Sequence, residues 1–394
     1  MVPNGWNRIA LEKIAEVRSG VAKGKKGLKA PIEVPYLRVA NVQDGHVDLT
    51  EVKTIEIEQD KLERYSLKYG DVLMNEGGDY DKLGRGDVWL GQIEPCLHQN
   101  HVFAVRPNQD IVDSFFLAAL AASNYGKTYF LSCAKRSTNL ASINSTQIKE
   151  FPVLVPPLPE QKKIAKILST WDKAISTTEK LIATSQQQKK ALMQQLLTGK
   201  KRLLDKNGVR FGGEWKHQRL ASLCTIKTGK KDVNEGNPEG NYPFFTCASE
   251  PTKSDNYSYD CEALLIAGNG MLGKTHYFNG KFEAYQRTYI LSEFIGIDVP
   301  FLHQYILYWL MRDIDREKQH GAMPYIKLGL LQNFKVLLPS IAEQQKIAAI
   351  LSCADQEITA LQQKLDALKQ EKKALMQQLL TGKRRVKVDE NVAA

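Results

Sequence analysis

The chain has 394 residues, a formal net charge of +10 and a pI of about 9.1. This length predicts two or three domains, and the content of 43% hydrophobic and 25% charged residues excludes a disordered or fibrous protein. No run of 18 apolar residues occurs, and the first residues lack the pattern of a signal peptide, so we expect a cytoplasmic protein that does not span a membrane. The positive charge is compatible with a polyanionic partner such as nucleic acid.

The first globular segment, residues 6–151, is predicted to be an α+β domain. Short β-branched or aromatic runs bounded by Gly, Asn and Asp predict strands at 71–74, 87–90 and 101–105. An apolar stretch at 114–123 predicts one helix near the end of this domain.

A long helix is predicted next, beginning at Pro157-Leu-Pro-Glu160 and ending before Gly199. Its apolar residues recur in steps of three and four, which is typical of a helix that pairs with another helix as a coiled coil. Polar residues interrupt this seam in its middle, at Thr178, Ser185 and Lys189. The predicted pairing residues are Ile164, Leu168, Trp171, Ile175, Ile182, Leu192 and Leu196.

A second globular segment, residues 215–334, has the same character, with a predicted strand at 288–291 and a predicted helix at 299–311. Another long helix then begins at Ser340-Ile-Ala-Glu343, which has the pattern of a capping box. It ends before Gly382, and the basic residues that follow both long helices are expected to complement the helix dipoles. Its predicted pairing residues are Ile347, Leu351, Ile358, Leu361, Leu365, Leu368, Leu375 and Leu379.

The two halves are copies of one another. The string Lys-Lys-Ala-Leu-Met-Gln-Gln-Leu-Leu-Thr-Gly-Lys occurs at 189–200 and again at 372–383, which indicates an internal duplication. The halves also begin alike: Trp6, Leu11, Ile14 and Gly20 match Trp215, Leu220, Leu223 and Gly229. The predicted organisation is a domain at 1–157, a central helix at 158–199, a linker at 200–214, a second domain at 215–338, a C-terminal helix at 339–382 and a basic, then flexible tail at 383–394.

These repeated features resemble the specificity subunit of a Type I restriction-modification system. The resemblance is carried by the Pro-x-x-x-Glu-Gln helix starts, the duplicated Leu-Leu-Thr-Gly-Lys ends, and the Gly-Asp-Val-Leu and Leu-Gly-Arg or Leu-Gly-Lys turns. It implies two target-recognition domains separated by two helices that form an antiparallel coiled coil, in a pseudo-twofold molecule.

The same resemblance implies the function and the partners. Each recognition domain would read one half of a bipartite site in double-stranded DNA, and the helices would set the half-site spacing and dock two modification subunits. Restriction subunits would join the full complex. S-adenosylmethionine would be bound by the modification subunits, and ATP and Mg by the restriction subunits, with no cofactor on this chain.

One motif favours a different function. Residues 268–275, Gly-Asn-Gly-Met-Leu-Gly-Lys-Thr, fit the P-loop pattern of NTP-binding enzymes. That pattern requires a helix immediately afterwards, whereas 276–282 is typical of a strand and a turn. The corresponding turn of the first half, Leu83-Gly84-Arg85-Gly86, lacks the pattern, and a basic turn facing DNA phosphates accounts for both copies. A coiled-coil scaffold without DNA readout is the remaining alternative.

No metal or catalytic site is predicted. Cys96, His98 and His101 are close in sequence, but in a strand the first two side chains face one side and the third faces the other. The sequence also has no Asn/Asp-Pro-Pro-Tyr/Phe methyltransferase motif, so we expect catalysis to come from partner subunits.

Basic loops are the candidates for DNA contacts, because Arg can bind guanine through two hydrogen bonds and Lys neutralises phosphate. The loops after Gly20 and Gly229 are basic in both halves. For each residue, the alternative is an ordinary solvated surface charge. The predicted DNA-binding residues are Lys23, Lys25, Lys26, Arg38, Arg85, Arg136, Lys227, Lys230, Lys231, Lys253, Lys274, Arg287 and Tyr325.

Overall fold

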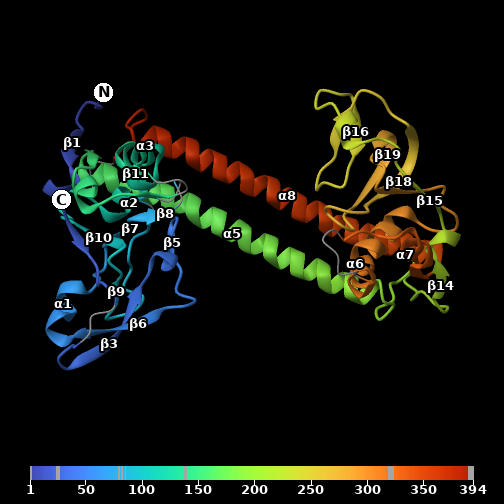
Figure 1. Ribbon diagram of the computed structural model, residues 1–394, viewed down its shortest axis with the longest axis horizontal. Helices are drawn as coiled ribbons and strands as arrows, with labels where there is room; N and C mark the ends of the chain where they lie inside the picture. The colour runs from blue at the N-terminus through green and yellow to red at the C-terminus, as the bar shows by residue number, and fades with distance from the viewer. Residues whose placement is uncertain are drawn as a thin grey trace. The chain divides into compact units, whose positions relative to one another are not determined.

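The chain folds into two units in the computed structural model, which describes residues 2–23, 27–78, 80, 83–84, 86–136, 140–317 and 324–388 (Figure 1). Unit 1 comprises Met1–Thr178 and Lys364–Ala394, and unit 2 comprises Glu179–Gln363. Each unit therefore combines one globular part with portions of both long helices.

Unit 1 is built on short strands. An antiparallel three-stranded sheet has the order β2-β10-β7, and a second sheet has the order β6-β3-β9, with β9 parallel to β3. The smaller pairings are β1-β13, β4-β5 and β11-β12-β8. The strands are β1 (Asn7–Ala10), β2 (Ala15–Ser19), β3 (Pro31–Leu37), β4 (Val42–Gln43), β5 (His46–Val47), β6 (Lys53–Glu58), β7 (Val72–Asn75), β8 (Gly77–Gly78), β9 (Leu97–His98), β10 (Val102–Pro107), β11 (Lys135–Arg136), β12 (Ala141–Ser142) and β13 (Pro152–Val155).

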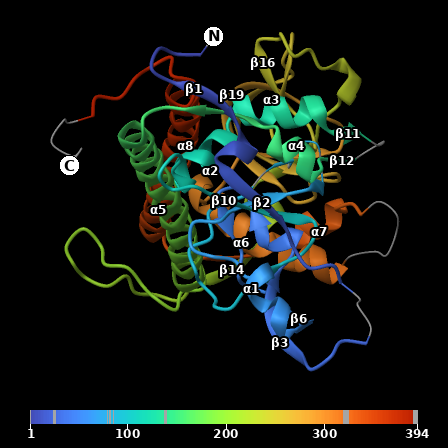
Figure 2. The ribbon, with the colours of Figure 1, turned by 90° about the vertical axis from the view of Figure 1, so that its left-hand side faces the viewer.

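The core of unit 1 lies on both faces of the β2-β10-β7 sheet. Along β7, Val72 and Met74 pack toward α2, whereas Leu73 packs into a second cluster around Trp89. This alternation explains why β7 and β10 are almost continuously apolar. Figures 1 and 2 show α1, β3 and β6 at the lower end of the unit, below β2 and β10. The helices are α1 (Leu62–Tyr65), α2 (Ser114–Ala122), α3 (Asn124–Cys133) and α4 (Ser145–Lys149).

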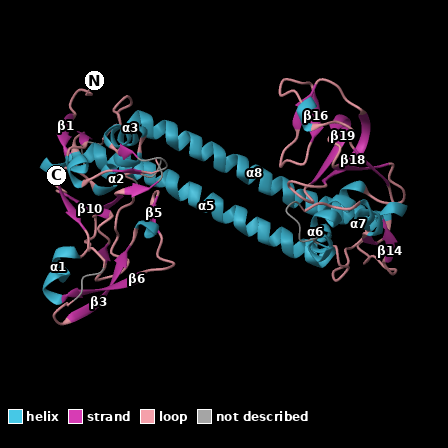
Figure 3. Cartoon of the chain, viewed as in Figure 1, coloured by secondary structure: helices cyan, strands magenta, loops and turns pink. Residues whose placement is uncertain are grey.

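Unit 2 contains a six-stranded sheet with the order β15-β20-β18-β19-β16-β17 and a separate β14-β21 pair. Along β18, Leu264 and Ile266 pack toward α6, while Ala263 and Leu265 face a second cluster on the other side. Figure 3 shows β16, β18 and β19 above α6 and α7. The elements are β14 (Lys216–Arg219), β15 (Thr225–Thr228), β16 (Tyr242–Phe245), β17 (Thr252–Ser254), β18 (Tyr259–Ala267), β19 (Thr275–Ala284), β20 (Thr288–Ser292), α6 (Val299–Glu317), α7 (Leu328–Asn333) and β21 (Lys335–Leu338).

The two long helices are α5 (Leu158–Leu196) and α8 (Ile341–Leu379). In unit 1, Ile164 near the start of α5 shares a core cluster with Leu379 at the end of α8. In unit 2, Leu196 at the end of α5 clusters with Ile347 near the start of α8. The helices therefore pair antiparallel within each unit.

Ion pairs join the same helices at repeated positions. Lys372 of α8 pairs with Asp172 of α5 in unit 1, and Lys189 of α5 lies 2.6 Å from Asp355 of α8 in unit 2. The polar interruption at Lys189 is thus an interhelical ion pair. All fifteen predicted pairing residues are buried or half-buried, namely Ile164, Leu168, Trp171, Ile175, Ile182, Leu192, Leu196, Ile347, Leu351, Ile358, Leu361, Leu365, Leu368, Leu375 and Leu379.

The predicted α+β class and the two long helices are confirmed, but the strand predicted at 87–90 is wrong. Only Val88 forms an isolated bridge, to Val72. Glycines bound this segment closely: a Cβ at Gly86 would lie 1.5 Å from a carbonyl oxygen, and Gly91 has a φ of +72°. Backbone hydrogen bonds from Leu73 to Asp87 and from Trp89 to Asp71 flank the bridge, so the contact with β7 is short.

The capping box predicted at Ser340 forms only in part. The Ser340 hydroxyl accepts from the backbone N–H of Glu343 at 3.4 Å, but the Glu343 carboxylate accepts two hydrogen bonds from Arg202, at 2.8 and 2.7 Å. A charged fork satisfies the carboxylate better than a single backbone N–H can. Arg202 therefore binds a buried carboxylate on the other long helix, rather than acting only on the dipole of the helix it follows.

Unit 1 repeats this arrangement. Arg385, which follows α8, donates two hydrogen bonds of 2.7 Å to the carboxylate of Glu160 at the start of α5. Each arginine also lies over a tryptophan ring, Arg385 over Trp6 and Arg202 over Trp215. We call each such set of glutamate, arginine and tryptophan a latch.

In the part of the chain that the structure describes, no helix combines the length and apolar character needed to cross a membrane.

Candidate nucleic-acid interface

In unit 1, the loop after β2 is held against the turn that precedes β10. Val21 forms a parallel bridge with Gln99, and the backbone N–H of Asn100 donates to the Val21 carbonyl at 3.0 Å. Gly20 is required for this approach, because a Cβ there would lie 2.0 Å from the carbonyl oxygen of His98. The start of the loop after Gly20, at Val21, is therefore held beside the turn at 99–101.

Unit 2 repeats the arrangement. Lys231 forms a parallel bridge with Tyr285, and the N–H of Gln286 donates to the Lys231 carbonyl at 3.0 Å. A Cβ at Gly229 would lie 2.1 Å from the carbonyl oxygen of Ala284. The match of Gly20 with Gly229 in the sequence thus corresponds to the same close backbone approach in both units.

A second pair of hydrogen bonds aligns the next loops. The N–H of Glu76 donates to the His101 carbonyl in unit 1, and the N–H of Gly268 donates to the Arg287 carbonyl in unit 2, both at 2.9 Å. His101 and Arg287 each directly precede a strand that has a neighbour on both sides, β10 or β20. His101 therefore corresponds to Arg287, and Glu76 corresponds to Gly268.

The Leu-Gly-Arg and Leu-Gly-Lys turns also correspond. Gly84 donates to the Asn75 carbonyl at 3.3 Å, and Gly273 donates to the Ala267 carbonyl at 2.9 Å. Both glycines are left-handed, with φ of +65° and +77°, a conformation that side chains disfavour. The basic residue after each glycine, Arg85 or Lys274, was a predicted DNA contact, and Arg85 lies outside the described residues.

The P-loop interpretation of residues 268–275 is wrong. The segment leads into strand β19 (Thr275–Ala284), not into a helix. The backbone N–H groups of Gly268, Met271, Gly273 and Lys274 all donate to carbonyl oxygens of the protein. The donors that a P-loop would direct at phosphate are therefore already used.

Three predicted DNA-binding residues of unit 2 come together at Gly268. Its N–H bonds to the Arg287 carbonyl, and its own carbonyl accepts from Ile326, the residue after Tyr325, at 2.8 Å. The Lys274 carbonyl accepts from Ala267, the residue before Gly268, at 2.9 Å. The side chains of Lys274, Arg287 and Tyr325 are exposed. Together with residues 229–231 they form what we call the unit 2 loop cluster.

The other four predicted residues of unit 2 differ in their surroundings. Lys230 is exposed, whereas Lys231 lies 2.7 Å from Glu235, and this hydrogen bond raises the pKa of Lys231. Lys227 and Lys253 lie on the edge strands β15 and β17 and are exposed. The loop cluster does not include these two lysines.

In unit 1, Lys23 and Arg38 follow residues whose backbone contacts the turn at 99–101. Lys23 is exposed and follows Val21 by two residues. Arg38 follows Leu37, whose carbonyl accepts from Gln99 at 2.8 Å, and its guanidinium lies 3.7 Å from Glu51.

Arg136 reaches the same turn from the other side. It lines a cavity of about 510 Å³ together with His101 and Val39. Its guanidinium lies 5.9 Å from the centre of the Tyr80 ring. Lys25 and Lys26 lie outside the described residues. We call Lys23, Arg38, Arg136 and the turn at 99–101 the unit 1 loop cluster.

The three possible metal ligands of unit 1 have separate surroundings. Burial raises the pKa of the Cys96 thiol to about 12. His98 is buried, and its Nδ1 atom forms a 2.6 Å hydrogen bond with the Val102 carbonyl oxygen. His101 instead pairs with Glu76. Among the residues the structure describes, no three His, Cys, Asp or Glu side chains are placed to hold a metal ion.

Sequence reasoning missed His101 as a member of the unit 1 loop cluster and Glu76 as its partner. His101 entered only as a possible metal ligand, and the strand alternation used against that site does not apply to it, because β9 ends at His98 and His101 lies in the turn that follows. Glu76 carries no signal in the sequence, because a carboxylate is not expected at a DNA-binding surface. Only the hydrogen bond to His101 reveals its position.

Comparison with known proteins adds an independent line of evidence. The family model for the Type I restriction modification DNA specificity domain matches residues 3–185 and 212–370. A putative type I restriction enzyme MjaX specificity subunit from Methanocaldococcus jannaschii is 29% identical, over 98% of this chain and 95% of its own length. The EcoDI specificity subunit from Escherichia coli is 36% identical, over 43% of this chain and 37% of its own length.

The fold is also similar to solved structures. The S subunit of a Type I restriction-modification system from M. genitalium matches with a TM-score of 0.63 and 16% identity, over 96% of this chain and 97% of that one. A structure from work on assembly of the type I R-M system matches with a TM-score of 0.60 and 18% identity, over 98% and 100%. The chain therefore belongs to the Type I restriction modification DNA specificity family, and it is a specificity subunit that carries two copies of that domain.

Proposed function

We propose that each unit reads one half of a bipartite site in double-stranded DNA through its loop cluster, with residues 1–157 and 215–338 as the two target-recognition domains. One observation carries this proposal: the two clusters share a backbone arrangement but differ in side chains. His101 stands where Arg287 stands, and Glu76 stands where Gly268 stands. A common framework with different exposed donors and acceptors is suited to reading two different base sequences.

The test is sequencing of methylated DNA from cells that express the chain with its native modification subunit. A second strain carries the chain with residues 215–334 exchanged for those of another recognition domain. We expect a split motif of which only one half changes after the exchange. If both halves change, or if no motif depends on the chain, two independent readers are excluded.

We propose further that the long helices dock two modification subunits at equivalent surfaces. The string repeated at 189–200 and 372–383 is identical even at exposed positions, where packing does not require identity. Lys190, Gln194 and Gln195 are exposed in unit 2, and the same residue types are exposed at the matching positions 373, 377 and 378 in unit 1. If two identical partners bind this chain, each needs the same surface, which accounts for the identity of the two repeats at exposed positions.

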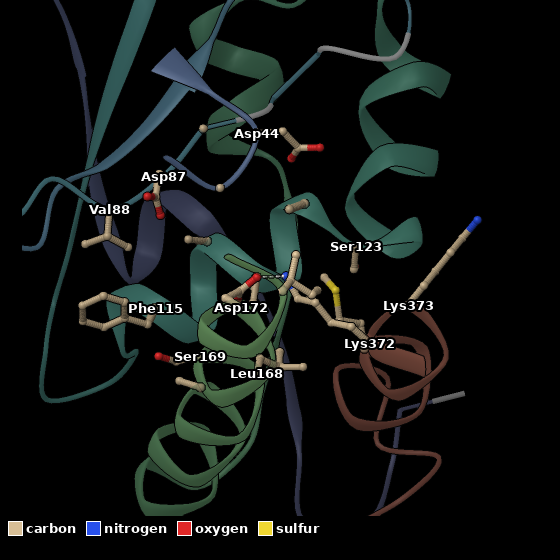
Figure 4. A pocket seen from close by; sticks show the side chains of 18 of the residues that line it. Asp44, Asp87, Val88, Phe115, Ser123, Leu168, Ser169, Asp172, Lys372 and Lys373 are labelled. Atoms are coloured by element: carbon tan, nitrogen blue, oxygen red, sulfur yellow. Dashed lines mark hydrogen bonds and ion pairs between the residues drawn. The ribbon is translucent and has the colours of Figure 1, made fainter. Parts of the chain in front are cut away.

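In unit 1, this surface borders a cleft of about 530 Å³ (Figure 4). Its floor includes Leu168 of α5 and the ion pair between Asp172 and Lys372, and Phe115 of α2 lines its wall. Phe115 is 42% exposed, so its ring is accessible to a partner from the cleft. A protein partner that inserts an apolar side chain here would bury Phe115.

Docking can be tested with paired charge reversals. Lys190→Glu and Lys373→Glu each alter one copy of the surface, and we expect each variant to bind one modification subunit instead of two. Lys180→Glu is the control, because Lys180 is exposed on α5 outside the repeat. Mass measurement of the purified complex gives the stoichiometry. Equal retention of both subunits in all three variants contradicts docking at this surface.

The long helices are also proposed to set the distance between half-sites. Each is a continuous helix of 39 residues, about 58 Å long at ~1.5 Å per residue. Inserting one heptad into 176–190 should change the preferred spacing while both half-site sequences stay the same. A change in the half-site sequences themselves contradicts the spacing role.

In this scheme the partners supply the chemistry. The modification subunits bind S-adenosylmethionine, restriction subunits with ATP and Mg complete the nuclease, and assembly takes place in the cytoplasm. Specificity is the contribution of this chain, as its family assignment states.

A further inference from the structure

Glu76 and His101 form an exposed polar pair at a position that both units share. The Oε2 atom of Glu76 lies 2.5 Å from Nδ1 of His101. The His101 side chain is 55% exposed and the Glu76 side chain 31%. Both residues line the cavity of about 510 Å³ that also contains Arg136. The pair therefore faces the same cavity as Arg136 of the unit 1 loop cluster.

The carboxylate determines which hydrogen-bonding groups the pair can offer. When Nδ1–H donates to Glu76, the neutral imidazole keeps Nε2 as an acceptor. The second carboxylate oxygen of Glu76 is also an acceptor. The corresponding site of unit 2 has the opposite character, because Arg287 carries only donors and Gly268 carries no side chain.

This difference matches the chemistry of base edges in the major groove. Adenine and cytosine present an exocyclic amino group, which is a donor, whereas guanine presents two acceptors, O6 and N7. Acceptor side chains suit the amino groups, and the guanidinium of an arginine suits guanine.

We propose that Glu76 and His101 together read a base with an exocyclic amino group, adenine or cytosine, in the first half-site, and that Arg287 reads guanine at the corresponding place in the second. This inference rests on the proposed function. It adds to that function which residues contact the DNA at one position of each half-site and which class of base they recognise there.

The central test replaces the two side chains of unit 1 with those at the corresponding positions of unit 2. The double variant Glu76→Gly, His101→Arg is expressed with the native modification subunit, and the methylated motif is determined by sequencing. We expect one position of the first half-site to change from adenine or cytosine to guanine, while the second half-site stays the same. A purely structural role for the pair would lower methylation without creating a preference for guanine.

Two single variants keep the proposal testable if the double variant methylates poorly. We expect Glu76→Gln and His101→Gln each to reduce discrimination at that one position by about 10- to 100-fold, with the other positions unaffected. His217→Ala is the control, because His217 is an exposed histidine on β14 outside both loop clusters. It should leave the motif unchanged.

The outcomes separate this inference from the proposed function. If the variants methylate the wild-type motif with unchanged discrimination, the pair does not read a base, while the two-reader scheme stands. If the second half-site changes as well, or if the wild-type motif does not depend on the chain, the proposed function itself fails.

Discussion

The buried ion pair of the unit 2 latch allows a quantitative prediction. Glu343 is fully buried, the Arg202 side chain is 20% exposed, and the two groups share hydrogen bonds of 2.8 and 2.7 Å. Replacing Arg202 with alanine leaves a carboxylate buried without its partner. Breaking a buried pair in this way costs about 3–5 kcal/mol. Because Arg202 keeps some contact with solvent, we expect the lower end, about 3 kcal/mol.

The assay is thermal unfolding of the chain purified with its modification subunit. For a unit of this size, ~3 kcal/mol corresponds to a fall in Tm of roughly 6–12 °C. Adding Glu343→Gln to Arg202→Ala removes the stranded charge and should restore at least half of the loss. The equivalent change in unit 1, Arg385→Ala, should have a smaller effect, because the Arg385 side chain is 45% exposed.

Lys201→Ala is the control that distinguishes the latch from a helix dipole effect. Lys201 follows the same helix and is exposed, so its interaction with the dipole is worth at most about 1 kcal/mol. Equal losses in Lys201→Ala and Arg202→Ala would refute the reasoning, because a dipole effect does not depend on the carboxylate of Glu343.

Three further predictions concern other parts of the chain. Burial raises the pKa of Asp87 above its ordinary value of 3.8. The folded state therefore favours the protonated carboxyl, and the stability of the folded state falls as pH rises through the raised pKa and the buried group becomes charged. Asp87→Asn should therefore raise the Tm at neutral pH, because the amide carries no charge. Thermal unfolding measured over a series of pH values should show this increase in Tm vanish toward pH 3.8. Lys189→Ala should cost about 1 kcal/mol in denaturant unfolding, because its pair with Asp355 is half-buried. Gly229→Ala should disrupt the second half-site only, as the new Cβ would meet the Ala284 carbonyl at 2.1 Å, and the methylated motif tests this.

The long helices could be predicted from sequence because their signals are local and repeated. The absence of glycine and proline between 160 and 198 and the apolar periodicity both indicate a long helix. The first long helix was predicted to end before Gly199, and Gly199 has a left-handed φ of +70°. The latch could not be predicted in this way, because Glu343 and Arg202 are distant in sequence. The position of each residue also has a local explanation: Glu343 fits a capping box, and Arg202 fits an interaction with the helix dipole.

The loop clusters show where sequence reasoning reaches its limit. The matching glycines, Gly20 and Gly229, were found from the repeat, and they do mark the same backbone approach. The equivalence of His101 and Arg287 was not found, because the two residues differ and the segments between the repeated ends have different lengths. Hydrogen bonds between loops establish that equivalence, and such bonds leave no periodic pattern in a sequence.

Under the proposed function, the latch and the loop clusters together explain how one framework can carry two different readers. In each unit, the latch joins a tryptophan before the first strand, a glutamate at the start of one long helix and an arginine after the end of the other. The loop clusters are attached through backbone hydrogen bonds and through a glycine that admits no side chain. Because backbone bonds do not depend on side-chain identity, exposed residues such as His101 and Arg287 can differ without disturbing the framework. If the loops read DNA as proposed, their exposed residues can change with the DNA sequence while the helices and the latch stay the same.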